Sequence, residues 1–288
     1  MNKNLPIGIF DSGVGGLTVL REFLAVLPEE NYLYFGDTAR VPYGSKSSKT
    51  VIRFSLEVSS YLADQGIKLL VVACNSASAL AIDDLRKLIP VPVIDVINPG
   101  VSKAINMTNN GKIGIIGTSA TIASGAYEQV LRKINSKIKT ISRPCPLFVP
   151  FAEENWIKHP ACKLVAEEYL ETFRNNKVDV LILGCTHYPI LKDVISEVMG
   201  PEVTLVDSAE STAMEAADIL SQNDIAAREN NSPFLKFFVS DLTANFRKIG
   251  EQFLGRTMEN ITNVPVEKLE KYKTVKKQEI DKRTKDKN

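Results

Sequence analysis

The sequence predicts an α/β protein with two pseudo-symmetric domains, each a mostly parallel sheet flanked by helices. Short, continuously apolar runs alternate with helical patterns, as expected for buried parallel strands joined by crossover helices. Two of these runs, 69–73 and 180–184, lead directly into Cys74 and Cys185. Side chains at the carboxyl ends of such strands project into the crevice where α/β sheets bind ligands. The two thiols therefore predict a pair of acid/base groups that face one substrate.

The two halves of the chain repeat the same order of strand, turn and polar residue. Residues 7–12 align with 113–118, and the run 92–96 follows the first cysteine as 203–207 follows the second. Any single match is weak, because apolar strands followed by small residues are common in α/β proteins. Three matches in order, with the cysteines in register, favour internal pseudo-symmetry.

The bulk properties are those of a globular protein. A chain of 288 residues can bury a large core and fits two domains. A net charge of +1 gives no reason to expect nucleic acid or an anionic membrane as a partner. The N-terminus lacks a signal-peptide apolar region and no segment approaches membrane-spanning length, so we expect a cytoplasmic protein. The four cysteines should stay reduced, and they lack the paired spacing of a zinc site.

Strand-like and helical patterns alternate along the chain. The expected strands are 5–10, 31–35, 67–73, 91–96, 112–117, 138–142, 178–183 and 203–206. Helical patterns separate them, beginning with 16–27, 47–64 and 77–88. In the first of these, leucines at positions 17, 20, 24 and 27 form one face of a 3.6-residue period.

Two points divide the chain into domains. One boundary is expected at 98–100 and the other near Asp207. The helix expected at 209–222 and the strand at 234–239 have no sheet of their own, so we assign them to a discontinuous first domain. Residues 265–288 are rich in lysine and are expected to be a basic tail, either a solvated, frayed helix or a flexible segment. Interspersed acidic residues disfavour the alternative of a nucleic-acid-binding arm. The predicted domains are residues 1–97 with 208–264, and residues 98–207.

A glycine-rich segment, 10–17, follows the first expected strand. Asp37 stands after the second strand, where a ribose-binding acid could lie, but Thr18 occupies the third glycine position of the dinucleotide fingerprint. A nucleotide site is therefore disfavoured. We expect the loop to bring backbone N–H groups and a helix N-terminus to a small anion such as a carboxylate. Asp11, at the strand end, can accept a hydrogen bond from an ammonium group or a thiol.

The polar neighbours of Cys74 and Cys185 set them apart from the other cysteines. A free cysteine alone is more often a packing residue, and we assign that role to Cys145 and Cys162. A helix that begins just beyond each of the first two thiols would favour the thiolate. The polar residues that follow these two thiols are Asn75, Ser76, Thr186 and His187.

Three further features adjoin the expected site. His187 can tune or protonate a group in the crevice, although a lone histidine is usually a hydrogen-bonded residue at a strand end. Glu153 follows an apolar loop and is either a supporting acid or a surface carboxylate. The loop 36–44 is rich in turn formers and is expected to form a wall of the site. Within it, Tyr43 is either a wall residue or a packed aromatic.

Five motifs in combination resemble the aspartate/glutamate racemase superfamily. They are FDSGVGGLTV at 10–19, GDTARVPYG at 36–44, ACNSAS at 73–78, CPLFVPFAEE at 145–154 and GCTHYP at 184–189. The resemblance runs from about residue 6 to residue 263. One departure is Ser76, where the family usually has threonine; the hydroxyl group is kept.

The resemblance implies an active site in the cleft between two α/β domains, with no cofactor and no metal. It implies interconversion of L- and D-glutamate, with D-glutamate supplied to peptidoglycan synthesis. It identifies Cys74 and Cys185 as the two catalytic bases, assisted by Asp11, Glu153 and His187. The substrate-binding residues it implies are Asp11, Ser12, Pro42, Tyr43, Gly44, Asn75, Ser76, Thr118, Thr121, Thr186 and His187.

Racemisation fits the pair of thiols. One proton must leave one face of the α-carbon while another arrives at the opposite face, which needs one thiolate and one thiol. The alternatives are an aspartate or hydantoin racemase and a two-lobed glutamate-binding protein, which would not need two thiols. The expected partner is a small-molecule substrate, without nucleic acid or membrane. The sequence leaves the oligomeric state open, a homodimer included.

Overall fold

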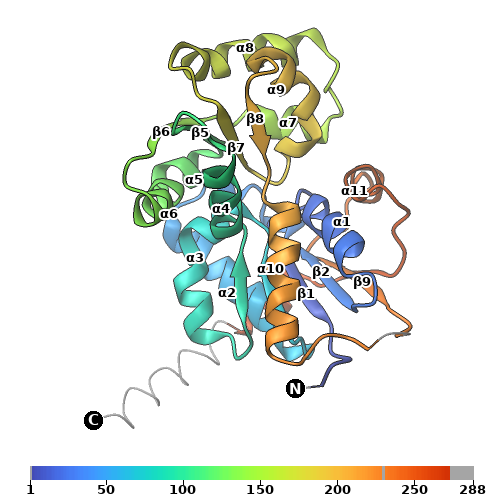
Figure 1. Cartoon of the computed structure of the whole chain (residues 1–288). Coiled ribbons are helices and arrows are strands. Elements are labelled where there is room, and N and C mark those ends of the chain that lie inside the picture. Colours follow the sequence, from blue (N-terminus) through green and yellow to red (C-terminus); the bar gives the residue numbers. More distant parts are fainter. Residues whose placement is uncertain (1, 229–230, 273–288) are drawn as a thin grey trace.

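Two parallel sheets, each flanked by helices, form the lower and upper parts of the molecule (Figure 1). The computed structural model describes residues 2–228 and 231–272. The predicted α/β class with two pseudo-symmetric domains is confirmed. Within the described residues, no helix has both the length and the apolar character that crossing a bilayer requires.

The six-stranded sheet of the first domain has the order β10-β9-β2-β1-β3-β4. Its strands are β1 (Ile7–Asp11), β2 (Tyr32–Gly36), β3 (Leu69–Val72), β4 (Val93–Asp95), β9 (Leu235–Val239) and β10 (Ile261–Asn263). Its helices are α1 (Leu17–Val26), α2 (Ser48–Asp64), α3 (Asn75–Leu88), α10 (Ala209–Gln222), α11 (Phe246–Leu254) and α12 (Val266–Glu270). Every residue of β1, β2 and β3 is buried, which explains why these strands are continuously apolar rather than alternating.

The four-stranded sheet of the second domain has the order β6-β5-β7-β8. Its strands are β5 (Lys112–Gly117), β6 (Lys139–Pro144), β7 (Val180–Gly184) and β8 (Thr204–Val206). Its helices are α4 (Ile97–Met107), α5 (Ser119–Ser124), α6 (Ala126–Ile134), α7 (Phe148–Glu153), α8 (Pro160–Asn175) and α9 (Lys192–Met199). Short 3₁₀ turns complete the chain: η1 (Thr38–Arg40), η2 (Tyr43–Ser45) and η3 (Tyr188–Leu191).

The repeat predicted from the sequence appears in the strand order. Strands β1 to β4 and strands β5 to β8 both follow the order second, first, third, fourth, and all their pairings are parallel. Strands β9 and β10 then extend the first sheet beside β2. As a result β3 and β7, which lead to the two cysteines, occupy equivalent positions in their sheets.

Two details differ from the sequence-based expectation. Residues 98–100 lie inside the first turn of α4 rather than in a loop, where Pro99 is tolerated because first-turn N–H groups have no intrahelical acceptor. Within the predicted tail, Val266–Glu270 form α12, which packs on α2, so this part of the chain is not flexible. Leu269 is fully buried, and the Tyr272 hydroxyl donates to Asp64 at 2.8 Å. The rest of the predicted tail, 273–288, lies outside the described residues.

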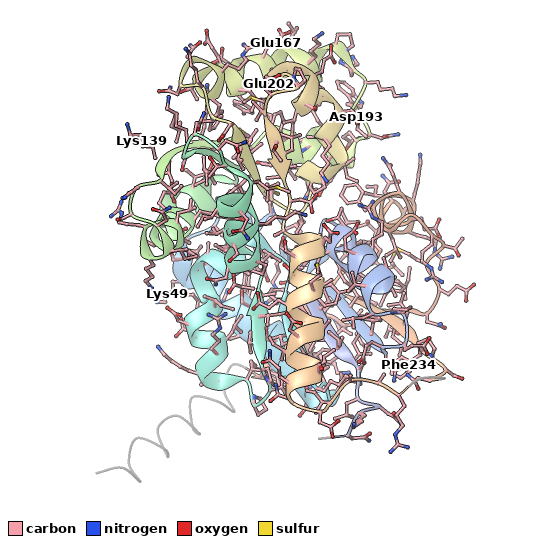
Figure 2. The ribbon with its side chains drawn as sticks, viewed as in Figure 1. Lys49, Lys139, Glu167, Asp193, Glu202 and Phe234 are labelled. Atoms are coloured by element: carbon pink, nitrogen blue, oxygen red, sulfur yellow. The ribbon has the colours of Figure 1, made fainter. Side chains whose placement is uncertain are left out.

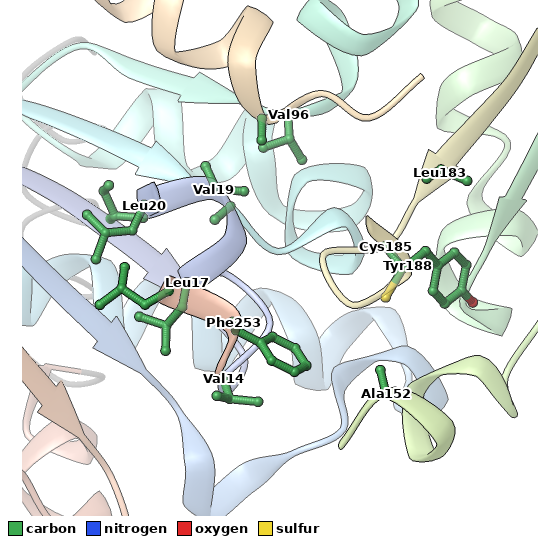
Figure 3. Packing of buried hydrophobic residues seen from close by; sticks show 14 of the residues in the cluster. Val14, Leu17, Val19, Leu20, Val96, Ala152, Leu183, Cys185, Tyr188 and Phe253 are labelled. Carbon is green, nitrogen blue, oxygen red and sulfur yellow. The ribbon is translucent and has the colours of Figure 1, made fainter. Parts of the chain in front are cut away.

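Side chains divide sharply between the surface and the interior. Charged residues such as Lys49, Lys139 and Glu202 are exposed on the outside of the two domains (Figure 2). The largest apolar cluster, by contrast, is shared between the domains. It passes from Val14 and Phe253 of the first domain to Cys185 and Tyr188 of the second (Figure 3). The shared core holds the two halves of the site against one another.

Candidate active site

One cavity between the domains brings the two thiols together. It encloses about 400 Å³ of space between atoms, part of it open to solvent. The residues that line it are Ser12, Val41, Pro42, Tyr43, Gly44, Cys74, Asn75, Ser76, Thr118, Val149, Glu153, Cys185, Thr186 and His187. These come from the carboxyl ends of strands in both sheets and from the loops and helix starts that follow them.

Most residues predicted for the site line this cavity, and two lie behind its wall. Asp11 is fully buried beneath the β1–α1 loop, and Thr121 is buried in α5. Val41 and Val149 line the cavity although they were not predicted as site residues. A signal for Val149 was present in the sequence, because it stands four residues before Glu153 and therefore on the same helical face.

The Cys74 thiol lies in a buried, hydroxyl-rich setting. Cys74 is the N-cap residue of α3, and its Sγ donates to Ser12 Oγ at 3.5 Å. Burial raises the pKa of this thiol to about 12, and the nearby Asp11 carboxylate adds to the rise. The backbone N–H of Ala77 and the Ser12 hydroxyl act in the opposite direction but are outweighed. The helix start therefore favours the thiolate as expected, but its effect on the pKa is smaller than that of burial.

The Cys185 thiol has a titratable partner instead. Its Sγ lies 3.8 Å from His187 Nδ1, and His187 Nε2 lies 2.9 Å from Glu153 Oε1. Burial lowers the pKa of His187, but its contacts with Cys185 and Glu153 outweigh burial and raise it to about 10. The imidazole therefore carries its proton at neutral pH. The ring of Phe253 packs against the His187 imidazole in a T-shaped arrangement, with the two ring centroids 5.6 Å apart.

Gly15, within the glycine-rich segment 10–17, permits close contact between the domains. A Cβ on Gly15 would lie 2.3 Å from Thr186 Oγ1 and 2.5 Å from His187 Cε1. Next to it, Thr18 Oγ1 donates to the Thr186 carbonyl at 3.0 Å. Ser12 is the residue of this segment that lines the cavity, whereas Gly15 lies at the contact between the domains.

Asp11 stabilises the loop from below. Its Oδ2 accepts from the Gly13 N–H at 2.9 Å, and its Oδ1 accepts from Thr186 Oγ1 at 3.4 Å. Burial raises the pKa of Asp11, opposed by the His187 charge and by these donors. The carboxyl group is therefore shared between the β1–α1 loop and the Cys185 segment rather than presented to the cavity.

A cluster of hydroxyl groups joins the domains on the Cys74 side. Ser76 Oγ lies 2.9 Å from Thr118 Oγ1 and 3.2 Å from Thr121 Oγ1, and the two threonine hydroxyls are 3.0 Å apart. Asn75 Nδ2 donates to the hydroxyl of Tyr127, on α6, at 2.8 Å. These neutral donors can bind a carboxylate without placing a fixed charge near Cys74.

The loop after β2 is anchored by a buried ionic network. Asp37 Oδ2 accepts from the Tyr43 hydroxyl at 2.5 Å and from Arg40 Nε at 2.7 Å, and Arg40 also pairs with Glu57. The Asp37 carboxylate is thus buried and bonded to neighbouring side chains, so it is not available to bind a ribose. Tyr43 is nearly fully buried and lines the cavity, so it is a packed aromatic and a wall residue at once.

The residues available for metal binding are few. Over 2–228 and 231–272, His, Cys, Asp and Glu side chains form no group of three or more that could hold a metal ion. The chemistry that the cavity itself offers is proton transfer by two thiols, one of which adjoins a protonated imidazole.

Comparisons with known proteins agree on one family. The Asp/Glu/Hydantoin racemase family model matches residues 15–216. A glutamate racemase from Geobacter metallireducens is 50% identical over 261 residues, covering 91% of this chain and 97% of that protein. One from Neisseria meningitidis serogroup A is 45% identical, covering 92% and 98%.

Solved structures show the same similarity. The crystal structure of glutamate racemase from Francisella tularensis in complex with D-glutamate superposes with a TM-score of 0.87 at 40% identity. It covers 92% of this chain and 98% of that one. The Thermus thermophilus glutamate racemase, in complex with β-chloro-D-alanine, gives a TM-score of 0.84 at 42% identity, covering 93% and 100%.

Proposed function

The chain belongs to the Asp/Glu/Hydantoin racemase family and is an amino-acid racemase, and we propose that it interconverts L- and D-glutamate by proton transfer between two cysteines. The observation that carries the proposal is the pair of thiols, Cys74 and Cys185, at equivalent strand ends of two repeated domains and in one cavity. Glutamate is the proposed substrate because relatives over nine-tenths of the chain are glutamate racemases.

The proposed reaction begins with Cys185 as thiolate and Cys74 as thiol. The proton on His187 places a positive charge beside Cys185, and a neighbouring cation favours a thiolate. The Cys185 thiolate takes the α-proton, and the electron pair of that C–H bond passes into the substrate carboxylate. The Cys74 thiol then gives its proton to the opposite face of the α-carbon. The enzyme ends with the two protonation states exchanged and can act on the other enantiomer.

Neutral donors around the cavity support the substrate. Its described lining contains no lysine or arginine, so hydroxyl and amide groups with the starts of α3 and α5 are left to bind the carboxylates. Charge that develops on the substrate carboxylate is stabilised best by donors already in position. Ser76 and Thr118 are suited to this role because each is held by the other across the domain boundary.

No cofactor is needed in this scheme, because the thiols supply both the base and the acid. We further propose that the product D-glutamate serves peptidoglycan synthesis, which is consistent with the bacterial origin of the related enzymes.

The test is incubation of the purified protein with L-glutamate in deuterated water without added cofactor. D-glutamate should appear carrying α-deuterium, while the remaining L-glutamate keeps most of its hydrogen early in the reaction. Chiral chromatography with mass spectrometry reads both quantities. Turnover of aspartate or a hydantoin in place of glutamate would contradict the substrate, and glutamate binding without hydrogen exchange would contradict catalysis.

A further inference from the structure

Tyr127 lies behind the cavity wall and contacts both cysteine-bearing segments. It belongs to α6 of the second domain and is about 1% exposed. Its hydroxyl accepts the buried hydrogen bond from Asn75, the residue after Cys74 in the first domain. Its ring packs against Gly184, the residue before Cys185. No sequence motif drew attention to this tyrosine.

The contact with Gly184 is as specific as the hydrogen bond. A Cβ built on Gly184 would lie 2.7 Å from the Ile116 carbonyl oxygen, 3.1 Å from Tyr127 Cε2 and 3.5 Å from its Cζ, so the neighbouring strand and the ring together occupy the space that a side chain would need. The backbone that leads into Cys185 therefore packs against the hydroxyl-bearing edge of the tyrosine ring. The amide that follows Cys74 is hydrogen-bonded to the hydroxyl at that same edge.

The hydrogen bond also fixes the amide itself. Because Nδ2 of Asn75 is engaged by the phenol, the amide group cannot rotate freely while it lines the cavity. A buried amide that lost this partner would retain an unsatisfied N–H, which costs more than the bond contributes. The amide would then turn toward the cavity and disturb the substrate there.

We propose that Tyr127 is a positioning residue that sets the placement of the two thiol-bearing segments relative to one another across the domain boundary. The inference rests on the proposed function, since two-base racemisation needs both thiols aligned on opposite faces of one carbon. Small errors in such alignment cost large factors in rate. Tyr127 acts through Asn75 and Gly184 and need not touch the substrate.

The test compares Tyr127→Phe with Tyr32→Phe. Tyr32 is a matched control, because it is equally buried and its hydroxyl donates to the Phe23 and Leu27 carbonyls, which do not line the cavity. Both variants keep the ring and lose a buried hydroxyl, so their melting temperatures should fall by similar amounts. For glutamate, kcat/KM should fall about tenfold in Tyr127→Phe, the effect of one lost hydrogen bond, and less than about twofold in Tyr32→Phe.

A second measurement does not depend on glutamate turnover. A short bis-electrophile that bridges Cys74 and Cys185, with the product quantified by mass spectrometry, reports the relative placement of the thiols. Its yield should fall in Tyr127→Phe and stay unchanged in Tyr32→Phe. Equal kinetics and equal bridging yields in the two variants would overturn the positioning role. Wild-type protein that bridges normally but does not racemise glutamate would instead contradict the proposed function.

Discussion

The Cys74 and Cys185 sides of the cavity share a scaffold but differ in their electrostatics. Both thiols follow the third strand of a four-strand repeat with the same order. Cys74 is surrounded by hydroxyl groups and an amide, and burial with Asp11 keeps its proton bound. Cys185 adjoins His187, which is itself paired with Glu153. The repeated fold thus supplies two equivalent positions, while the local neighbours make them chemically unequal.

This inequality matches the need for one acid and one base at the start of a turnover. Two identical thiols would hold their protons equally, and much of the enzyme would be in a state with both protonated. The hydrogen-bonded pair of His187 and Glu153 breaks the symmetry on one side only. In the proposed mechanism this difference assigns the base at the start of a turnover to Cys185 and the acid to Cys74.

The largest effect should come from removing either thiol. Cys74→Ser and Cys185→Ser should each lower racemisation by about 10³-fold or more, because a serine hydroxyl is a far weaker acid than a thiol and does not ionise to act as a base at neutral pH. Each variant should still exchange the α-hydrogen of one enantiomer, a different one in each case. Exchange should be faster in Cys74→Ser, which keeps Cys185 with its imidazolium.

Proton NMR in deuterated water with each pure enantiomer measures this exchange. Correct folding of both variants, checked by circular dichroism, is the control. Equal exchange rates in the two variants would show that the Cys74 and Cys185 sides of the cavity are chemically equivalent.

The next largest effect should come from His187→Asn. The variant removes the positive charge beside Cys185, and kcat should fall about 10²-fold. Alkylation of Cys185 by iodoacetamide, followed by peptide mass spectrometry, should slow while that of Cys74 is unchanged. His159→Asn is the matched control, because His159 is exposed, stacks on Trp156, and lies outside the cavity. Slower alkylation of both thiols would indicate a general structural role for His187.

How much of this site could be read from the sequence depends on the kind of interaction. Continuous apolar runs with cysteines at their ends predicted β3 and β7, and hence the positions of both thiols. This was possible because a strand buried on both faces consists almost entirely of apolar residues. The relation of His187 to Cys185 was also local, two residues along the chain. Which of the two thiols holds its proton more firmly could not be predicted, because burial and the Asp11 charge depend on the tertiary environment.

Contacts between segments that are distant along the chain could not be predicted from the sequence in the same way. Tyr127 and Phe253 touch the cysteine segments from α6 and α11, and nothing in their own neighbourhoods indicates a site. The three-residue strand β10 was likewise missed, since a run of that length carries little periodicity. The contact of Gly15 with Thr186 and His187 could not be predicted either, because only the folded chain shows which residues approach it.

The pH dependence should reveal the paired histidine. The raised pKa of His187 means that its proton stabilises the folded state fully below its unfolded pKa of about 6.5, and that this contribution is lost as pH rises toward about 10. Activity that depends on the imidazolium should therefore decline on approach to pH about 10. Glu153→Gln removes a charge that raises this pKa, so the decline should shift to lower pH. A profile of kcat/KM against pH for both proteins measures the shift, and coincident alkaline limbs would contradict the pairing.

The smallest effect should arise on the Cys74 side, from Thr121→Val. This change keeps the shape of the side chain and removes a hydroxyl that bonds to Ser76 and Thr118 behind the cavity wall. The free energy of unfolding should fall by about 1 kcal/mol, the usual contribution of one hydrogen bond. Because this cluster is argued to bind substrate rather than move protons, KM should rise a few-fold with kcat unchanged. Steady-state kinetics measures KM and kcat, and urea denaturation measures the free energy of unfolding. A fall in kcat at constant KM would mean that the hydroxyl groups on the Cys74 side support proton transfer, as His187 does on the Cys185 side.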